Sequence, residues 1–277
     1  MKDILEELNA DPFDYVKTVN TPIGVYLRRE VFQEKCDTML KRNLYKRISA
    51  NQSADGSWNN LFVDTANNLW DLHLLDYEAD DVSTKRGLSW LLTIQRHQYR
   101  GYPGFFLSDN REDARKMRHT LYGEFGPGCM IFYQTAYAIH LFHLFGFDEN
   151  QRVQTAVKSY LQFWRPNWCG AWCTINVLRV LVEHNLSAHS EQVEKGIKLL
   201  AGRQTKRGGW KGFPFYHTVH ALSRSEHALA ERQVKKAFGS VVKRQNQDGS
   251  WGNQRQETET FLVLDALRNI DAQQHVQ

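Results

Sequence analysis

Apolar residues recur along this chain at the spacing of amphipathic helices, and the same arrangement is repeated. The segments KRGLSWLLTIQ (85–95), EKGIKLLAGRQ (194–204) and VKKAFGSVVKRQ (234–245) carry apolar residues at positions i, i+3, i+4 and i+7, which is typical of a helix with one buried face. Neither period-two alternation nor hairpin turn pairs recur. The pattern therefore predicts an all-α protein.

Each of these helices leads into a corner that contains glycine and an aromatic residue. ANQSADGSW ends at Trp58, AGRQTKRGGW at Trp210 and KRQNQDGSW at Trp251, while two divergent corners end at Phe105 and Trp172. We expect glycine to end the helix with a positive φ and the aromatic ring to pack between neighbouring helix pairs.

A second, more apolar helix follows each corner and begins with a polar residue and a threonine that is expected to help cap it. The threonines are Thr65, Thr135, Thr174, Thr218 and Thr260, at intervals of 70, 39, 44 and 42 residues. The long first interval contains an insertion, 108–126. Segments such as INVLRVLV are apolar nearly all round, so these helices are expected inside and the amphipathic ones outside.

The repeats predict one α/α toroid domain spanning 1–277, with N-terminal helices in 1–50 and five to six helix-pair repeats over 40–270. Alternating outer and inner helices also suit an open solenoid, but about six pairs favour a closed ring.

Composition narrows the class of protein. With 42% hydrophobic and 24% charged residues, the chain is typical of a soluble globular protein, and it contains no apolar run of about 18 residues, the length that spans a bilayer. The N-terminal segment lacks a secretory signal, which predicts a cytoplasmic protein. A net charge of +4 is too small to indicate nucleic-acid binding. Four cysteines in a chain of this length favour reduced thiols or a metal site over a disulfide framework.

The corners resemble a known motif. They combine Lys or Arg followed by Gly and an apolar residue, a Gln several residues later, and then Gly-x-Trp, as in RGLSWLLTIQ and RQNQDGSWG. This pattern resembles the QW repeat of squalene-hopene cyclases and related terpenoid cyclases. That superfamily shares its α/α toroid, an α6/α6 barrel-like fold, with the β subunits of protein prenyltransferases. The resemblance covers about 40–270 and implies an enzyme that binds an isoprenoid-like apolar small molecule. Because prenyltransferase β subunits work as halves of heterodimers, it also raises the question of a partner subunit.

The inner helices of such a toroid begin at one mouth, where the residues before the threonines should converge. These residues are Asp64, Gln134, Cys173, His217 and Glu259. Thiolate, imidazole and carboxylate suit zinc. The segment FYHTVHALS, 215–223, resembles the one that carries the zinc-binding His of prenyltransferase β subunits, which implies His217 as a ligand.

The resemblance places Cys173 one repeat before His217, but the family's Asp-x-Cys motif is not matched because Ala171 stands at the Asp position. Our preferred hypothesis is zinc-assisted prenyl or alkyl transfer, with Cys173 and His217 as ligands and Gln134 positioning the substrate. Asp64 or Glu259 supplies a carboxylate; Cys169 is an alternative third ligand.

Two alternatives stay open. LFVDTAN resembles the acidic motif of class II terpene cyclases, which implies Asp64 as the acid that protonates the substrate. The other alternative is a non-catalytic toroid or a carbohydrate-active one, which would use Asp64 and Glu259 as a carboxylate pair.

Further residues are candidates for substrate binding. Aromatic rings that suit an isoprenoid chain or a carbocation are expected from Tyr133, Tyr137, Trp168 and Tyr216, and cations for an anionic group from Lys206 and Arg207. His73, His140, His143 and His220, inside the apolar helices, are interpreted as core histidines bonded to neighbours, although His140 and His143, at i and i+3, could also reach a ligand together.

Overall fold

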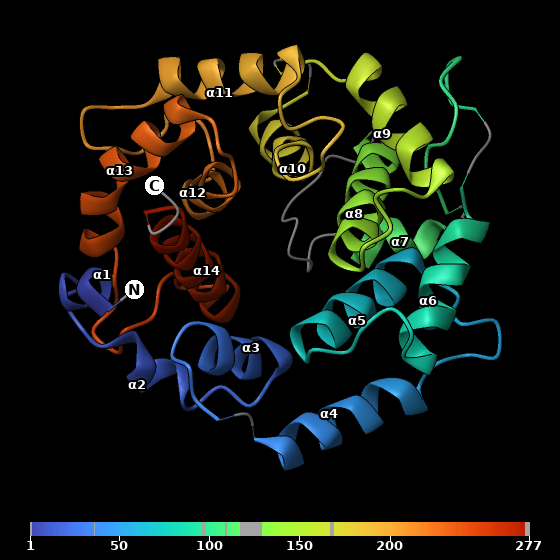
Figure 1. Cartoon of the computed structure of the whole chain (residues 1–277), viewed down its shortest axis with the longest axis horizontal. Coiled ribbons are helices and arrows are strands. Elements are labelled where there is room, and N and C mark those ends of the chain that lie inside the picture. The colour runs from blue at the N-terminus through green and yellow to red at the C-terminus, as the bar shows by residue number, and fades with distance from the viewer. Residues whose placement is uncertain are drawn as a thin grey trace. The chain divides into compact units, whose positions relative to one another are not determined.

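A computed structural model describes residues 2–35, 37–95, 98–108, 110–116, 129–166 and 169–274. Within these ranges the regular structure is helical, and strand-like pairing is limited to isolated bridges at the corners. The chain divides into two compact units (Figure 1): unit 1 comprises Met1–Lys41 and Lys195–Gln277, and unit 2 comprises Arg42–Glu194.

Unit 2 is built on three inner helices, α5 (Phe62–Leu74), α8 (Met130–Leu144) and α10 (Ala171–Leu181). Helix α8 contacts both α5 and α10, while α6 (Val82–Thr93) packs on α5 and α9 (Gln151–Phe163) on α8 (Figure 1). The unit also contains most of α4 (Thr38–Ala50) and the short α7 (Arg111–Lys116). Most residues of α8 and α10 are buried, as their nearly continuous apolar sequence predicts.

Unit 1 repeats the arrangement with α12 (Phe215–Ser223) and α14 (Gln256–Gln274) packed against each other. The amphipathic α13 (Ala228–Lys243) contacts α12, and α3 (Pro22–Glu30) contacts α14. The unit also holds α1 (Lys2–Glu6), α2 (Pro12–Val16) and most of α11 (Glu191–Arg203). Helix α12 stops at Ser223, earlier than the sequence suggests, because the polar segment 224–227 precedes α13.

The threonines of the repeat tie each inner helix to its corner rather than cap it. The hydroxyl oxygens of Thr65, Thr135 and Thr260 accept hydrogen bonds from the backbone N–H of corner aromatic residues, at 3.0, 3.1 and 2.9 Å. These threonines are fully buried, so each bond satisfies a backbone donor that water cannot reach. In the two other repeats the hydroxyls of Thr174 and Thr218 donate to nearby backbone carbonyls instead.

Glutamine and glycine have separate roles at the corners. The amide of Gln245 donates to the carbonyl of Gly249 in its own corner, at 3.1 Å, and to that of Ala10, at 2.8 Å. Gly249 has a φ of 85°, and a Cβ there would lie 2.3 Å from the carbonyl oxygen of Asp11. Glycine is therefore needed both for its backbone conformation and for the close approach of a neighbouring segment. It lies in the turn, six residues beyond the end of α13.

Among the described residues, the structure contains no helix with the length and apolar character needed to cross a membrane.

Candidate functional site

Asp64 lies in the first turn of α5, as predicted from the sequence, and its carboxylate accepts hydrogen bonds from two side chains. One oxygen, Oδ2, accepts from Lys116 Nζ and from Asn59 Nδ2, both at 2.7 Å. Its side chain is 18% exposed, against 38% for Lys116. Oδ2 of Asp64 is therefore shared between a cation from the insertion and an amide from the preceding corner.

A second carboxyl group, that of Asp113 on α7, caps the same helix. Its two oxygens accept from the backbone N–H groups of Phe62 and Val63, at 3.2 and 2.9 Å, while the N-cap residue Leu61 provides no side-chain bond. Burial raises the pKa of Asp113, opposed by the hydrogen bonds from Val63, Ser108 and Phe62. Sequence reasoning missed this cap because it comes from about 50 residues away, within the insertion. Residues 117–126 of that insertion lie outside the described part of the chain.

Gln134 is buried on α8 beside an aromatic cluster. Its Oε1 accepts from the backbone N–H of Ser108 at 2.7 Å, while its Nε2 has no hydrogen-bond partner within the described residues. The predicted substrate-binding Tyr133 and Tyr137 are fully buried and pack edge-to-face with each other and with Phe62, at 6.0–6.3 Å between ring centroids. The structure thus brings two predicted rings and the predicted positioning amide onto one helix in an apolar interior.

Cys173 meets two other cysteines. It lies in the first turn of α10, Cys169 just precedes that helix, and Cys129 is the N-cap residue of α8. The three sulfur atoms lie within 4.8 Å of one another, with 2.8 Å between those of Cys129 and Cys169. Burial raises the pKa values of both Cys173 and Cys129. The sequence suggested Cys169 as a companion for Cys173, but Cys129 was missed because it lies 40 residues from Cys169 and outside the repeated slot.

In unit 1, His217 and Glu259 lie in the first turns of α12 and α14. His217 is buried. The half-buried Glu259 has a pKa raised by burial and partly lowered again by Arg255. The charge of Glu259 in turn adds to the burial that raises the pKa of Tyr216, and Tyr216 packs on Phe215 at 5.3 Å between ring centroids. Glu259 is therefore a carboxyl group whose surroundings favour the protonated form.

The remaining predicted residues are less informative. Lys206 and Arg207 are exposed in the corner before α12, and Trp168 lies outside the described residues. The predicted zinc ligands are drawn from both units, Asp64 and Cys173 from unit 2 and His217 from unit 1. That ligand set stays a prediction.

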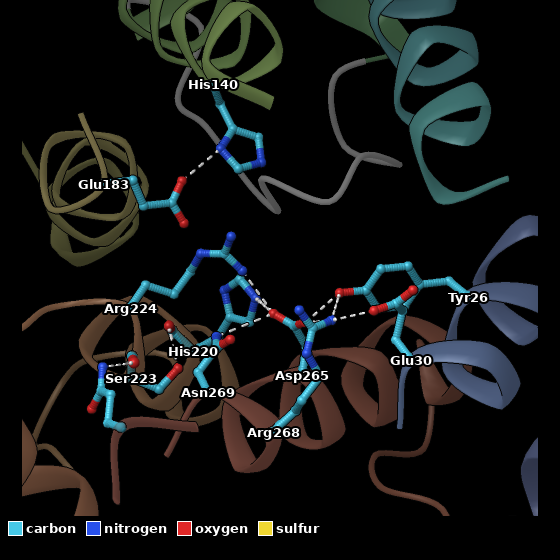
Figure 2. A network of polar contacts seen from close by, with 11 residues as sticks. Tyr26, Glu30, His140, Glu183, His220, Ser223, Arg224, Asp265, Arg268 and Asn269 are labelled. Carbon is cyan, nitrogen blue, oxygen red and sulfur yellow. Dashed lines mark hydrogen bonds and ion pairs between the residues drawn. The ribbon is translucent and has the colours of Figure 1, made fainter. Parts of the chain in front are cut away.

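A buried polar network that the sequence did not reveal surrounds Asp265 on α14 (Figure 2). Asp265 is 1% exposed and accepts from Tyr26 Oη at 2.7 Å and from Arg224 Nη1 at 2.7 Å, while His220 Nε2 lies 3.0 Å from its Oδ2. Arg268 donates to the Tyr26 hydroxyl and lies 3.6 Å from Asp265.

The network fixes Asp265 as an anion. Burial alone would raise the pKa of Asp265, but the charge of Arg224 and the bond and charge of His220 hold it well below its usual range. A carboxyl group with a lowered pKa does not serve as an acid at neutral pH. The contacts of Asp265 instead connect α3, α12 and α14 of unit 1.

Unit 2 contains a comparable buried pair, also drawn in Figure 2. His140 Nδ1 on α8 lies 3.0 Å from Glu183 Oε2, just beyond α10, with the two side chains 1% and 6% exposed. The His140 ring also packs on Trp70 of α5 at 5.5 Å between centroids. The interpretation of His140 and His220 as core histidines bonded to neighbours is confirmed, whereas their acidic partners were not anticipated.

Comparison with known proteins identifies the fold. No protein-family profile and no curated protein matches the sequence. Among solved structures, the chain is similar to the ligand-free type II terpene cyclase MstE from Scytonema, with a TM-score of 0.62 and 13% identity over 94% of this chain and 88% of that one. An MstE variant in complex with geranylgeranyl dihydroxybenzoate, its substrate, matches with a TM-score of 0.60 and 13% identity over 93% of this chain and 86% of that one.

A protein from Actinoplanes is also similar, with a TM-score of 0.57 and 18% identity over 90% of this chain and 89% of that one. At such identities the likeness concerns the fold. It confirms the fold class expected from the repeats, and with it the resemblance to the terpenoid cyclase superfamily at the level of architecture. The chain therefore has the all-α, α/α-toroid fold of the type II terpene cyclases.

Proposed function

We propose that this protein binds an isoprenoid-like apolar substrate and acts on it as a terpene cyclase-like enzyme. The observation that carries the proposal is the fold likeness over more than nine-tenths of the chain to a cyclase solved with geranylgeranyl dihydroxybenzoate and with merosterolic acid A, its product. One fold hosts many chemistries, so the residues of this chain must support the same conclusion.

Aromatic residues on the inner helices support an apolar ligand. In unit 2, Phe62, Tyr133 and Tyr137 form an edge-to-face cluster, and Gln134 on the same helix has an amide N–H₂ available for a polar group of the ligand. Aromatic faces attract cations, and a carbocation formed during cyclisation would be stabilised in such surroundings.

A cyclase of this type also needs a carboxylic acid that stays protonated until it meets the alkene. Of the two predicted carboxyl groups, Asp64 is paired with Lys116, whereas the raised pKa of Glu259 favours its protonated form. We therefore propose Glu259 as the acid, with Asp64 in an ion pair with Lys116. This reverses the role that the resemblance implied for Asp64.

The proposal is tested by incubating the full chain with geranylgeranyl dihydroxybenzoate in D₂O. Protonation of an alkene followed by loss of a proton gives an isomer of the substrate, so the product has a new retention time and carries one carbon-bound deuterium in place of a hydrogen. Dihydroxybenzoate without the isoprenoid chain serves as the control ligand. If the prenylated compound neither reacts nor raises the melting temperature above the control, the proposed function is wrong.

Two variants separate the candidate acids. Glu259→Gln should abolish deuterium incorporation while still binding the substrate, because the amide keeps the shape of the carboxyl group but cannot donate an acidic proton. Asp64→Asn should retain at least part of the activity. The opposite result, with activity lost only in Asp64→Asn, would return the role of acid to Asp64.

Zinc-assisted prenyl or alkyl transfer is a second candidate, favoured by the position of Cys173. A thiol with two further thiols within 4.8 Å is a plausible metal ligand, although the set differs from Cys173, His217 and a carboxylate. The test is transfer of a prenyl group from a prenyl diphosphate to a thiol in the presence of zinc, with release of diphosphate as the readout.

A further inference from the structure

Three thiols converge where two inner helices of unit 2 begin. Cys129 precedes α8, Cys169 precedes α10, and Cys173 lies in the first turn of α10. All three sulfur atoms lie within 4.8 Å of one another. Both helix N-termini carry a partial positive charge, which would stabilise a thiolate cluster once a metal ion is bound.

The spacing of the sulfur atoms matches a tetrahedral metal ion. With zinc–sulfur bonds of about 2.3 Å, the sulfur atoms of a tetrahedral site lie about 3.8 Å apart. The observed atoms range from 2.8 Å, between Cys129 and Cys169, to at most 4.8 Å. Small rotations of the side chains reach the required spacing. A disulfide, by contrast, would join only two of the sulfur atoms and leave the third beside it.

A cavity of about 190 Å³ adjoins the cluster and is lined by all three cysteines. Its other walls include the aromatic side chains of Phe132, Phe163 and Trp164 and two cationic ones. The cations are Arg100 and Arg165. Cys173 is buried and Cys169 is exposed, so a metal ion reaches the sulfur atoms from solution on the side of Cys169.

We propose that Cys129, Cys169 and Cys173 bind one zinc ion, with a fourth coordination position open to this cavity. Binding displaces one proton from each thiol, and a Zn²⁺ ion with three thiolates carries one net negative charge. The two arginines that line the cavity offset that charge. Three protein ligands and one open position are the arrangement of reactive zinc sites. The open position takes water or a thiolate from solution.

This site differs from the predicted one, which needs His217, and it does not depend on isoprenoid binding. The first measurement is metal content of the full chain purified without a histidine tag. We expect about one zinc per chain, lost in Cys129→Ser, Cys169→Ser and Cys173→Ser. The same substitution at Cys36, the remaining cysteine of the sequence, should retain zinc. His217→Ala should also retain it, whereas the predicted Cys173–His217 site would lose it.

Cobalt substitution tests the ligands and the open position. Co²⁺ bound to the wild-type chain should show strong sulfur-to-metal charge-transfer absorption, which decreases in each serine variant that still binds the ion. Added 2-mercaptoethanol should strengthen the absorption by occupying the fourth position. An unchanged spectrum would mean that the fourth position is closed and would overturn that half of the proposal.

A measurement on the wild-type chain covers the case in which a variant fails to fold. Zinc should protect the three thiols from a thiol-specific reagent, and a chelator should expose them. Metal-free protein with a disulfide between two of these cysteines, or loss of zinc in His217→Ala, would overturn the site. Neither result bears on the deuterium experiment, so failure of the zinc site and failure of the proposed cyclase function are distinguishable.

Discussion

Replacement of Asp265 by Asn tests whether the buried network holds the centre of unit 1 together. Asparagine keeps the shape of the side chain but removes the negative charge between Arg224, Arg268 and His220. Breaking a buried ion pair by removing one partner costs about 3–5 kcal/mol. The side chains of Arg224 and Arg268 are 21% and 36% exposed and regain some hydration, so we expect a loss at the lower end, about 3 kcal/mol.

The assay is reversible urea unfolding followed by circular dichroism, with a thermal melt in parallel. A loss of about 3 kcal/mol corresponds to a decrease in melting temperature of roughly 5 °C for a chain of this size. The control is Asp14→Asn, which breaks an exposed pair with Lys17 and should leave the free energy of unfolding nearly unchanged.

The pH dependence gives a second, independent check. The pKa of Asp265 is lowered in the folded state, so the stability it contributes is fully present above the unfolded pKa, about 3.9, and is lost as pH falls toward the folded value. The difference between wild type and Asp265→Asn should therefore be constant from about pH 5 to 8 and shrink in acid. A loss below about 1 kcal/mol, or a difference that grows in acid, would refute the reasoning.

Three further predictions concern the repeat. Gly249→Ala should cost at least about 2 kcal/mol, because it combines a positive φ with a backbone clash, whereas Gly239→Ala, in open space on α13, should stabilise by about 0.5–1 kcal/mol in urea unfolding. Thr260→Val removes the acceptor for a buried N–H and should cost about 1–3 kcal/mol, and an equal loss in Thr258→Val would contradict this. The pKa of Glu259 is raised in the folded state, so its contribution to stability is fully present below the unfolded pKa, about 4.3, and is lost as pH rises through the folded pKa. Glu259→Gln should therefore have a higher melting temperature than wild type at pH 7 but not at pH 4.

The repeat made most of the fold predictable. Outer helices carry apolar residues on one face, whereas inner helices are apolar nearly all round. Because this pattern is local, the burial of each segment can be predicted from its own sequence. The position before each threonine could likewise be read as the start of an inner helix, which places Asp64, Gln134 and Cys173 correctly on their elements. The role of the threonines was harder to predict, because a hydroxyl at a helix start serves equally as a cap and as an acceptor for the preceding corner.

The partners of the candidate residues could not be predicted from the chain. Lys116 binds Asp64 across 52 residues, and Tyr26 binds Asp265 across 239. A charged residue in a sequence gives no sign of which distant group it meets, since the partner is set by packing of whole helices. The same holds for Cys129, whose spacing to Cys169 and Cys173 matches no local metal motif.

By itself, the sequence determines an all-α chain of repeated helix pairs, because helix period, corner glycines and apolar content are local properties that survive in every copy. Only the tertiary structure decides the chemistry of the candidate groups. It pairs Asp64 with Lys116, raises the pKa of Glu259 by burial, and gathers three cysteines at two helix starts. Protonation state and metal affinity depend on burial and on neighbouring charges, and both arise when the helices pack.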